Sequence, residues 1–113
     1  MKSKFFATGI LLVGMVLSFE STANELVTKV VQVGCHTSDS NCFVYIDKAI
    51  PAGVANCSNR GSLRWDASMA KNAPQVYATL LAAAMADKEV RFGGVDKACV
   101  RGYPTFEYVL IRK

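Results

Sequence analysis

The chain has 113 residues, with 13 basic and 9 acidic side chains and a formal net charge of +4. This length allows a single domain with a modest core. The basic residues are scattered along the chain, without the run or cluster that a nucleic-acid footprint needs, so the charge predicts no nucleic-acid partner.

Residues 1–23 show the three-part pattern of a secretory signal peptide. A short head with two lysines precedes the uncharged apolar run Phe5–Phe19, and the small residues Ser21 and Ala23 follow. The run is shorter than the roughly 20 residues that span a bilayer. We therefore predict cleavage after Ala23, no stable membrane insertion, and a single exported domain, 24–113, that is secreted or periplasmic.

All four cysteines lie in the predicted exported part. An even count in a small exported chain indicates two disulfides, for which three pairings exist. Cys35 and Cys42 flank the polar stretch His36–Asn41, where a bridge would staple a hairpin, and this leaves Cys57 with Cys99. The close Cys-x-x-Cys pairs of structural zinc sites do not occur, so no metal is predicted.

The first half of the exported part predicts three strands. Leu26–Val33 is rich in valine, Phe43–Ile46 combines aromatic and β-branched residues, and Leu63–Trp65 is a short apolar segment. A loop that contains Pro51 and Gly53 separates the second strand from the third.

A helix follows the third strand. Pro74 suits a first helical turn, and Asn72 suits the cap before it. Apolar residues then recur at helical spacing up to Met85. We interpret the stripe of Tyr77, Leu81 and Met85 as the face of the helix that packs on the core.

Two more strands complete the predicted fold. Val90–Phe92 is the fourth strand, and Thr105–Arg112 is the fifth, with Phe106, Tyr108 and Leu110 on one face. The chain is thus mainly β with one helix. The order β-β-β-α-β-β is that of the OB-fold, a five-stranded barrel. An α+β sandwich built from the same elements is the alternative.

The sequence offers little for catalysis. His36 is the single histidine, and it lies in a loop between two cysteines that a disulfide would occupy, so a small hydrolase would have to depend on it alone. We predict a protein that is not an enzyme and needs no cofactor. Tyr45, Tyr103 and Tyr108 supply amphipathic aromatic surface of a kind that suits sugar rings, whereas we expect Trp65 to be buried beneath the helix.

Three stretches carry a resemblance to a known family. They are Val30–Thr37 (VVQVGCHT), Ala55–Cys57 with Leu63–Ser68 (LRWDAS), and Tyr77–Ala84 leading to Lys88–Phe92. Together they resemble the subtilase cytotoxin B-subunit-like family of small secreted bacterial proteins, over most of the predicted exported chain.

The resemblance implies an OB-type fold and the receptor-binding role of an AB5 toxin B subunit. Such subunits form rings of five, bind sialylated glycans and associate with a toxin A subunit. The resemblance also favours the Cys57–Cys99 bridge. It places Thr28 where the toxin subunit has a serine that contacts sugar; threonine keeps the hydroxyl and adds a methyl group.

The sequence therefore predicts a non-enzymatic exported protein that binds cell-surface glycans through Thr28, His36 and Tyr103. The alternative is a protein-interaction module, such as a periplasmic inhibitor or an adaptor for another exported protein.

Overall fold

The computed structural model describes residues 24–51 and 56–113. The predicted signal peptide, residues 1–23, lies outside this part of the chain. As predicted, the described chain is mainly β with one helix. Its elements, in chain order, are β1 (Glu25–Cys35), β2 (Asn41–Ile46), β3 (Leu63–Asp66), α2 (Ala73–Ala86), β4 (Glu89–Gly93), β5 (Cys99–Val100), β6 (Tyr103–Pro104) and β7 (Tyr108–Ile111).

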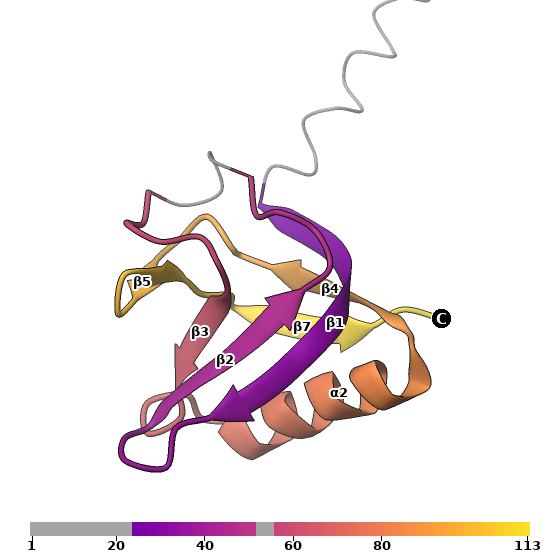
Figure 1. Cartoon of the computed structure of the whole chain (residues 1–113), viewed down its shortest axis with the longest axis horizontal. Helices are drawn as coiled ribbons and strands as arrows, with labels where there is room; N and C mark the ends of the chain where they lie inside the picture. Colours follow the sequence, from indigo (N-terminus) through magenta and orange to yellow (C-terminus); the bar gives the residue numbers. More distant parts are fainter. Residues whose placement is uncertain (1–23, 52–55) are drawn as a thin grey trace, which may run out of the picture.

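Five of the strands form one antiparallel sheet in the order β3-β2-β1-β4-β7. The long β1 pairs with β4 through its first half and with β2 through its second half. Its register with β2 shifts between Val30 and Gln32, which marks a bulge. In Figure 1, β1 curves across the sheet. The edge strands of this sheet are β3 and β7.

One face of the sheet packs against α2 and holds the core; we call it the inner face. The buried apolar side chains of the strands are Leu26, Val30, Cys42, Val44, Leu63, Trp65, Val90 and Phe92. From the helix, Leu80 and Ala83 are fully buried against them. The prediction that Trp65 is buried is confirmed.

The predicted core stripe of the helix is wrong for two of its three residues. Leu81 is 42% exposed and Met85 is 81% exposed, whereas Leu80 and Ala83 face the core. The helix is apolar over most of its circumference and carries no charge, so helical spacing fits several neighbouring stripes equally well. The helix face that packs on the sheet is the stripe that begins one residue earlier than the predicted one.

The last strand is shorter than predicted and begins at Tyr108. Phe106 precedes the strand and turns inward, with its ring centroid 4.9 Å from that of Phe92 and 5.6 Å from that of Trp65. Tyr108 and Leu110 are exposed. The predicted grouping of Phe106 with Tyr108 and Leu110 on one face is therefore wrong, because the strand alternation starts only after Phe106.

A short hairpin of β5 and β6 was not predicted. Its two-residue turn, Arg101–Gly102, has φ angles of 53° and 85°, as a type I′ turn requires. The hairpin packs on β3 and is seen beside that strand in Figure 1.

Both predicted disulfides are present. Cys35–Cys42 joins β1 to β2, and Cys57–Cys99 ties the segment before β3 to β5. Two bridges in a small domain are consistent with an oxidising, extracellular or periplasmic compartment. The described part of the chain contains no helix with the length and hydropathy to cross a membrane.

Candidate functional site

The face of the sheet turned away from α2, the outer face, carries the residues that we consider functional. Phe43 in β2 is paired with Gly34 in β1 on one side and with Arg64 in β3 on the other. Directly opposed residues on neighbouring strands share a face. Val44 and Leu63, their chain neighbours, are fully buried on the inner face.

Gly34 allows the Phe43 ring to lie across β1. A Cβ atom built at Gly34 would stand 2.9 Å from Cζ of that ring, closer than side-chain carbons approach. Here the glycine is needed for close approach and not for an unusual backbone angle. Any larger residue would push the Phe43 ring away from β1.

Further aromatic rings flank Phe43. The Tyr45 ring meets it edge to face and the His36 ring meets it at 55°, each with a centroid separation of 5.7 Å. Tyr45 and the His36 side chain are both partly open to solvent. The rings of His36, Phe43 and Tyr45 form a row beside the loop after β1.

Arg64 lies between this row and the β5–β6 hairpin. Its guanidinium carbon is 4.0 Å from the centroid of the Tyr103 ring and 5.4 Å from that of Phe43, both cation–π distances. Its Nε donates a hydrogen bond of 2.8 Å to Oγ of Ser62. Arg64 is only 8% exposed, yet no carboxylate within residues 24–51 and 56–113 forms an ion pair with it.

We call the group His36, Phe43, Tyr45, Arg64 and Tyr103 the Phe43 surface. The structure brings two of the three predicted site residues, His36 and Tyr103, to this surface. They belong to segments 67 positions apart that meet through Phe43 and Arg64.

Thr28, the third predicted residue, does not join them. It is only 2% exposed on the inner face, and its hydroxyl donates a 2.8 Å hydrogen bond to Oδ1 of Asp47. This hydrogen bond is the main cause that lowers the pKa of the Asp47 carboxyl. A sugar could reach the Thr28 hydroxyl only by displacing Asp47.

The loop after β1 holds a charged rim around the Phe43 surface. The carboxylate of Asp39 lies 3.4 Å from Nδ1 of His36 and accepts a 3.4 Å hydrogen bond from Nη1 of Arg101. The backbone N–H of Asn41 also donates to Asp39, at 3.0 Å, and is the main cause that lowers the pKa of this carboxyl. Asp39 thus links the β1–β2 loop to the turn of the β5–β6 hairpin.

Asp66, at the end of β3, fixes the other side of the same loop. It accepts hydrogen bonds from the hydroxyls of Ser68 at 2.6 Å and Ser40 at 2.7 Å, and from the Ser68 backbone N–H at 2.9 Å. These bonds, with the Ser68 hydroxyl first, lower the pKa of Asp66 to about 2. Asp66 is a structural acceptor and carries a full negative charge at neutral pH.

We expect Ser68→Ala to raise the pKa of Asp66 toward its ordinary value of 3.8, because the strongest stabilising contact of the ionised form is lost. A pH titration of the Asp66 carboxyl by NMR measures this shift. Because the folded pKa is depressed, Asp66 stabilises the fold above about pH 4, and this contribution disappears as the pH falls toward 2. An unchanged Asp66 pKa in the variant would contradict the assignment. Thr79→Ala, which removes a hydroxyl that donates a hydrogen bond within α2, is the matched control.

The described residues offer neither a cluster of metal ligands nor a free thiol. They contain no group of three or more His, Cys, Asp or Glu side chains that could hold a metal ion. All four cysteines are in disulfides. The side chains that converge on the Phe43 surface are aromatic and cationic, and this combination suits binding by stacking and charge.

Sequence reasoning placed Phe43 in a strand and Arg64 beside Trp65, but it did not identify either as part of a site. One signal was available: an arginine in the middle of the short apolar segment Leu63–Trp65 is unusual for a strand that lies against a core.

Comparison with known proteins gives no match, whether to a family model, to a curated protein or to a solved structure. The geometry of the Phe43 surface is therefore the basis for assigning a function.

Proposed function

We propose that this protein is an exported, non-enzymatic binding protein with an OB-type fold, and that its Phe43 surface binds an acidic glycan at a cell surface. The order of the five sheet strands and the helix, together with the curved β1 that pairs with two neighbours, supports the OB-type fold. The leader pattern of residues 1–23 and the two disulfides support a secreted or periplasmic location.

The environment of Arg64 is the observation that carries the proposal. Charged side chains are rarely this buried without a partner of opposite charge. The Tyr103 ring and the Ser62 hydroxyl hold the guanidinium in place. A planar guanidinium matches a carboxylate in a two-point contact, so an acidic sugar supplies the charge that this chain does not.

The neighbouring rings support a sugar as the bearer of that charge. Aromatic faces pack against the C–H faces of a sugar ring, while nearby polar groups hydrogen-bond its hydroxyls. Tyr45 and His36 lie on either side of Phe43, and Asp39 and Arg101 lie at the rim. Only the resemblance to the subtilase cytotoxin B-subunit-like family supports two further parts of the proposal, a ring of five copies and a toxin A subunit as partner.

A glycan array with protein recovered from the exported fraction tests this function. We expect binding to sialic acid-terminated glycans and weaker binding to the same glycans without sialic acid. Arg64→Gln should reduce affinity at least about ten-fold, because a hydrogen bond to a charged group contributes roughly 1.5–3 kcal/mol. His36→Ala, at a partly exposed position, should reduce affinity without disturbing the core.

Arg112→Gln is the matched control, because it removes the same charge at an exposed position on the end of the sheet. Near-UV circular dichroism shows whether each variant keeps its fold. Two results would overturn the proposal: a folded protein with both disulfides that binds no glycan, or glycan binding that Arg64→Gln and His36→Ala leave unchanged.

A further inference from the structure

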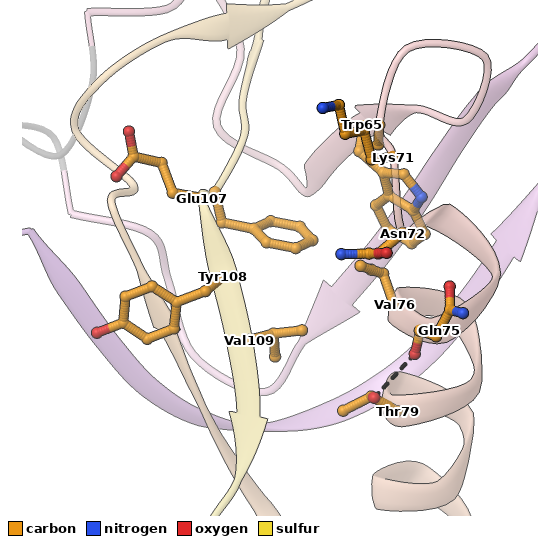
Figure 2. A pocket seen from close by; sticks show the side chains of 11 residues that line it. Trp65, Lys71, Asn72, Gln75, Val76, Thr79, Glu107, Tyr108 and Val109 are labelled. Atoms are coloured by element: carbon orange, nitrogen blue, oxygen red, sulfur yellow. Dashed lines mark hydrogen bonds between the residues drawn. The ribbon is translucent and has the colours of Figure 1, made fainter.

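A second exposed aromatic ring lies on the outer face, in the row of paired residues where β1 begins. Tyr108 of β7 is 45% exposed. Figure 2 shows its side chain on the opposite side of β7 from Val109, which faces α2 across a cavity of about 410 Å³. Tyr108 therefore points outward, whereas the cavity lies on the inner face. No residue of the Phe43 surface belongs to β1, β4 or β7.

Gly93 of β4 allows the Tyr108 ring to lie across the sheet. Gly93 pairs with Tyr108 on one side and with Glu25 of β1 on the other. A Cβ atom at Gly93 would collide with Cε2 and Cζ of the Tyr108 ring. The ring therefore crosses β4, and its hydroxyl donates a 3.3 Å hydrogen bond to Oε2 of Glu25. The side of the ring away from Gly93 is open to solvent and available to a ligand.

Arg91, the neighbouring outward residue of β4, has no partner of opposite charge. It lies two positions from Gly93 on the same face and pairs with Val27 of β1 and Leu110 of β7. It forms no ion pair within residues 24–51 and 56–113. Its Nε is shielded from solvent and has no hydrogen-bond acceptor in the same residues. A guanidinium this poor in acceptors is unusual, and a ligand can supply acceptors to its terminal nitrogens.

The charges beside Tyr108 indicate which ligand it can bind. The other charged side chains of these outward rows already form ion pairs, which are Lys29–Asp87 and Arg112–Glu89. Glu25 and Arg91 are left, one of each sign, as diagonal neighbours on paired strands at roughly 7–8 Å. Glu25 would repel an anionic ligand and Arg91 a cationic one. The hydroxyls of a neutral sugar can donate to the carboxylate and accept from the guanidinium.

We propose that Glu25, Arg91 and Tyr108, which we call the Tyr108 surface, bind a neutral hexopyranose. The C–H face of the sugar ring packs on the open side of the Tyr108 ring. Its hydroxyls donate to the Glu25 carboxylate, where the Tyr108 hydroxyl occupies only one of about four acceptor sites. Other hydroxyls accept from the terminal nitrogens of Arg91. This site is additional to the acidic-glycan site of the Phe43 surface and does not depend on it.

The two surfaces have a similar construction and differ in charge. In each, an aromatic ring covers a glycine of the neighbouring strand, and an arginine lacks an ion pair in the described residues. Only at the Tyr108 surface does a carboxylate without an ion pair, Glu25, accept a hydrogen bond from the ring itself. Glu25 and Gly34 lie nine positions apart along β1, or about 30 Å along an extended strand. One monosaccharide therefore cannot occupy both surfaces.

An NMR titration of the exported protein with methyl β-glucopyranoside, methyl β-galactopyranoside and methyl α-mannopyranoside tests the inference. We expect at least one of these glycosides, at millimolar concentration, to shift the amide resonances of Glu25, Arg91 and Tyr108. Tyr108→Ala should weaken binding at least about five-fold, because the stacking face is lost. Arg91→Met keeps the apolar stem and removes every donor, so it should weaken binding about ten-fold.

Tyr108→Phe, which keeps the ring, should retain more affinity than Tyr108→Ala, and Met85→Ala, an exposed change on α2, should leave binding unchanged. Near-UV circular dichroism shows that each variant is folded. The inference is overturned if none of the glycosides shifts these amides, or if folded Tyr108→Ala and Arg91→Met bind as tightly as the unmodified protein. It is also overturned if the methyl glycoside of sialic acid shifts them more strongly, since the site then takes an anion. The amides of Phe43 and Arg64 report separately on the Phe43 surface, so a failure at one surface is distinguishable from a failure at the other.

Discussion

Replacement of both Cys57 and Cys99 by alanine is expected to lower the free energy of unfolding by about 4 kcal/mol. In the chain-entropy model a disulfide stabilises by restricting the unfolded chain, and the effect grows with the length of the closed loop. This bridge joins residues 42 positions apart. Small domains have total stabilities near the lower end of roughly 5–15 kcal/mol, so the variant should be close to unfolding at 37 °C.

The second disulfide provides the matched control. Cys35 and Cys42 are only 7 positions apart, and the same model gives about 2 kcal/mol for the loss of their bridge. Urea denaturation of both double-alanine variants, followed by the fluorescence of the single tryptophan, measures the difference. Equal losses in the two variants would show that loop length does not govern the contribution of these bridges.

The longer bridge also affects the proposed binding surface. Cys99 is the first residue of β5, and the β5–β6 hairpin carries Tyr103, which covers the Arg64 guanidinium. Loss of the bridge frees one end of this hairpin. Glycan affinity should therefore fall more in the Cys57/Cys99 variant than in the Cys35/Cys42 variant, measured without denaturant at a temperature where both remain folded.

Periodicity was sufficient to predict the five strands of the sheet and the helix, because each is long or apolar enough to show its pattern. It was insufficient for the β5–β6 hairpin, whose strands have two residues each. The turn of this hairpin contains Arg101 at a positive φ, where asparagine or aspartate is the usual signal. Nothing in the local sequence distinguishes this segment from an ordinary loop.

The structure brings together only two of the three predicted site residues, and the reason lies in β1. Residues an even number apart on a regular strand share a face, so Thr28 and Gly34 would both face outward or both inward. The bulge between Val30 and Gln32 adds one residue. As a result Thr28 faces inward, and Gly34 lies under the Phe43 ring on the outer face. A bulge depends on pairing with β2, which the sequence of β1 alone does not reveal.

The core of the domain depends on Phe92. It is fully buried in β4, where it pairs with Leu26 of β1 and Val109 of β7, and its ring packs edge to face on Phe106. We expect Phe92→Ala to lower the free energy of unfolding by about 3–5 kcal/mol, since the loss of a buried ring removes its transfer free energy and leaves a cavity.

Phe92→Leu separates the contribution of the lost apolar burial from that of the cavity. Leucine stays apolar and fills most of the space, so we expect a loss of less than about 2 kcal/mol, near the range of volume-conserving exchanges. Leu81→Ala, at an exposed position on α2, is the control and should change stability by no more than about 1 kcal/mol. Urea denaturation followed by Trp65 fluorescence measures all three, and a Phe92→Ala loss as small as that of Leu81→Ala would contradict the described core.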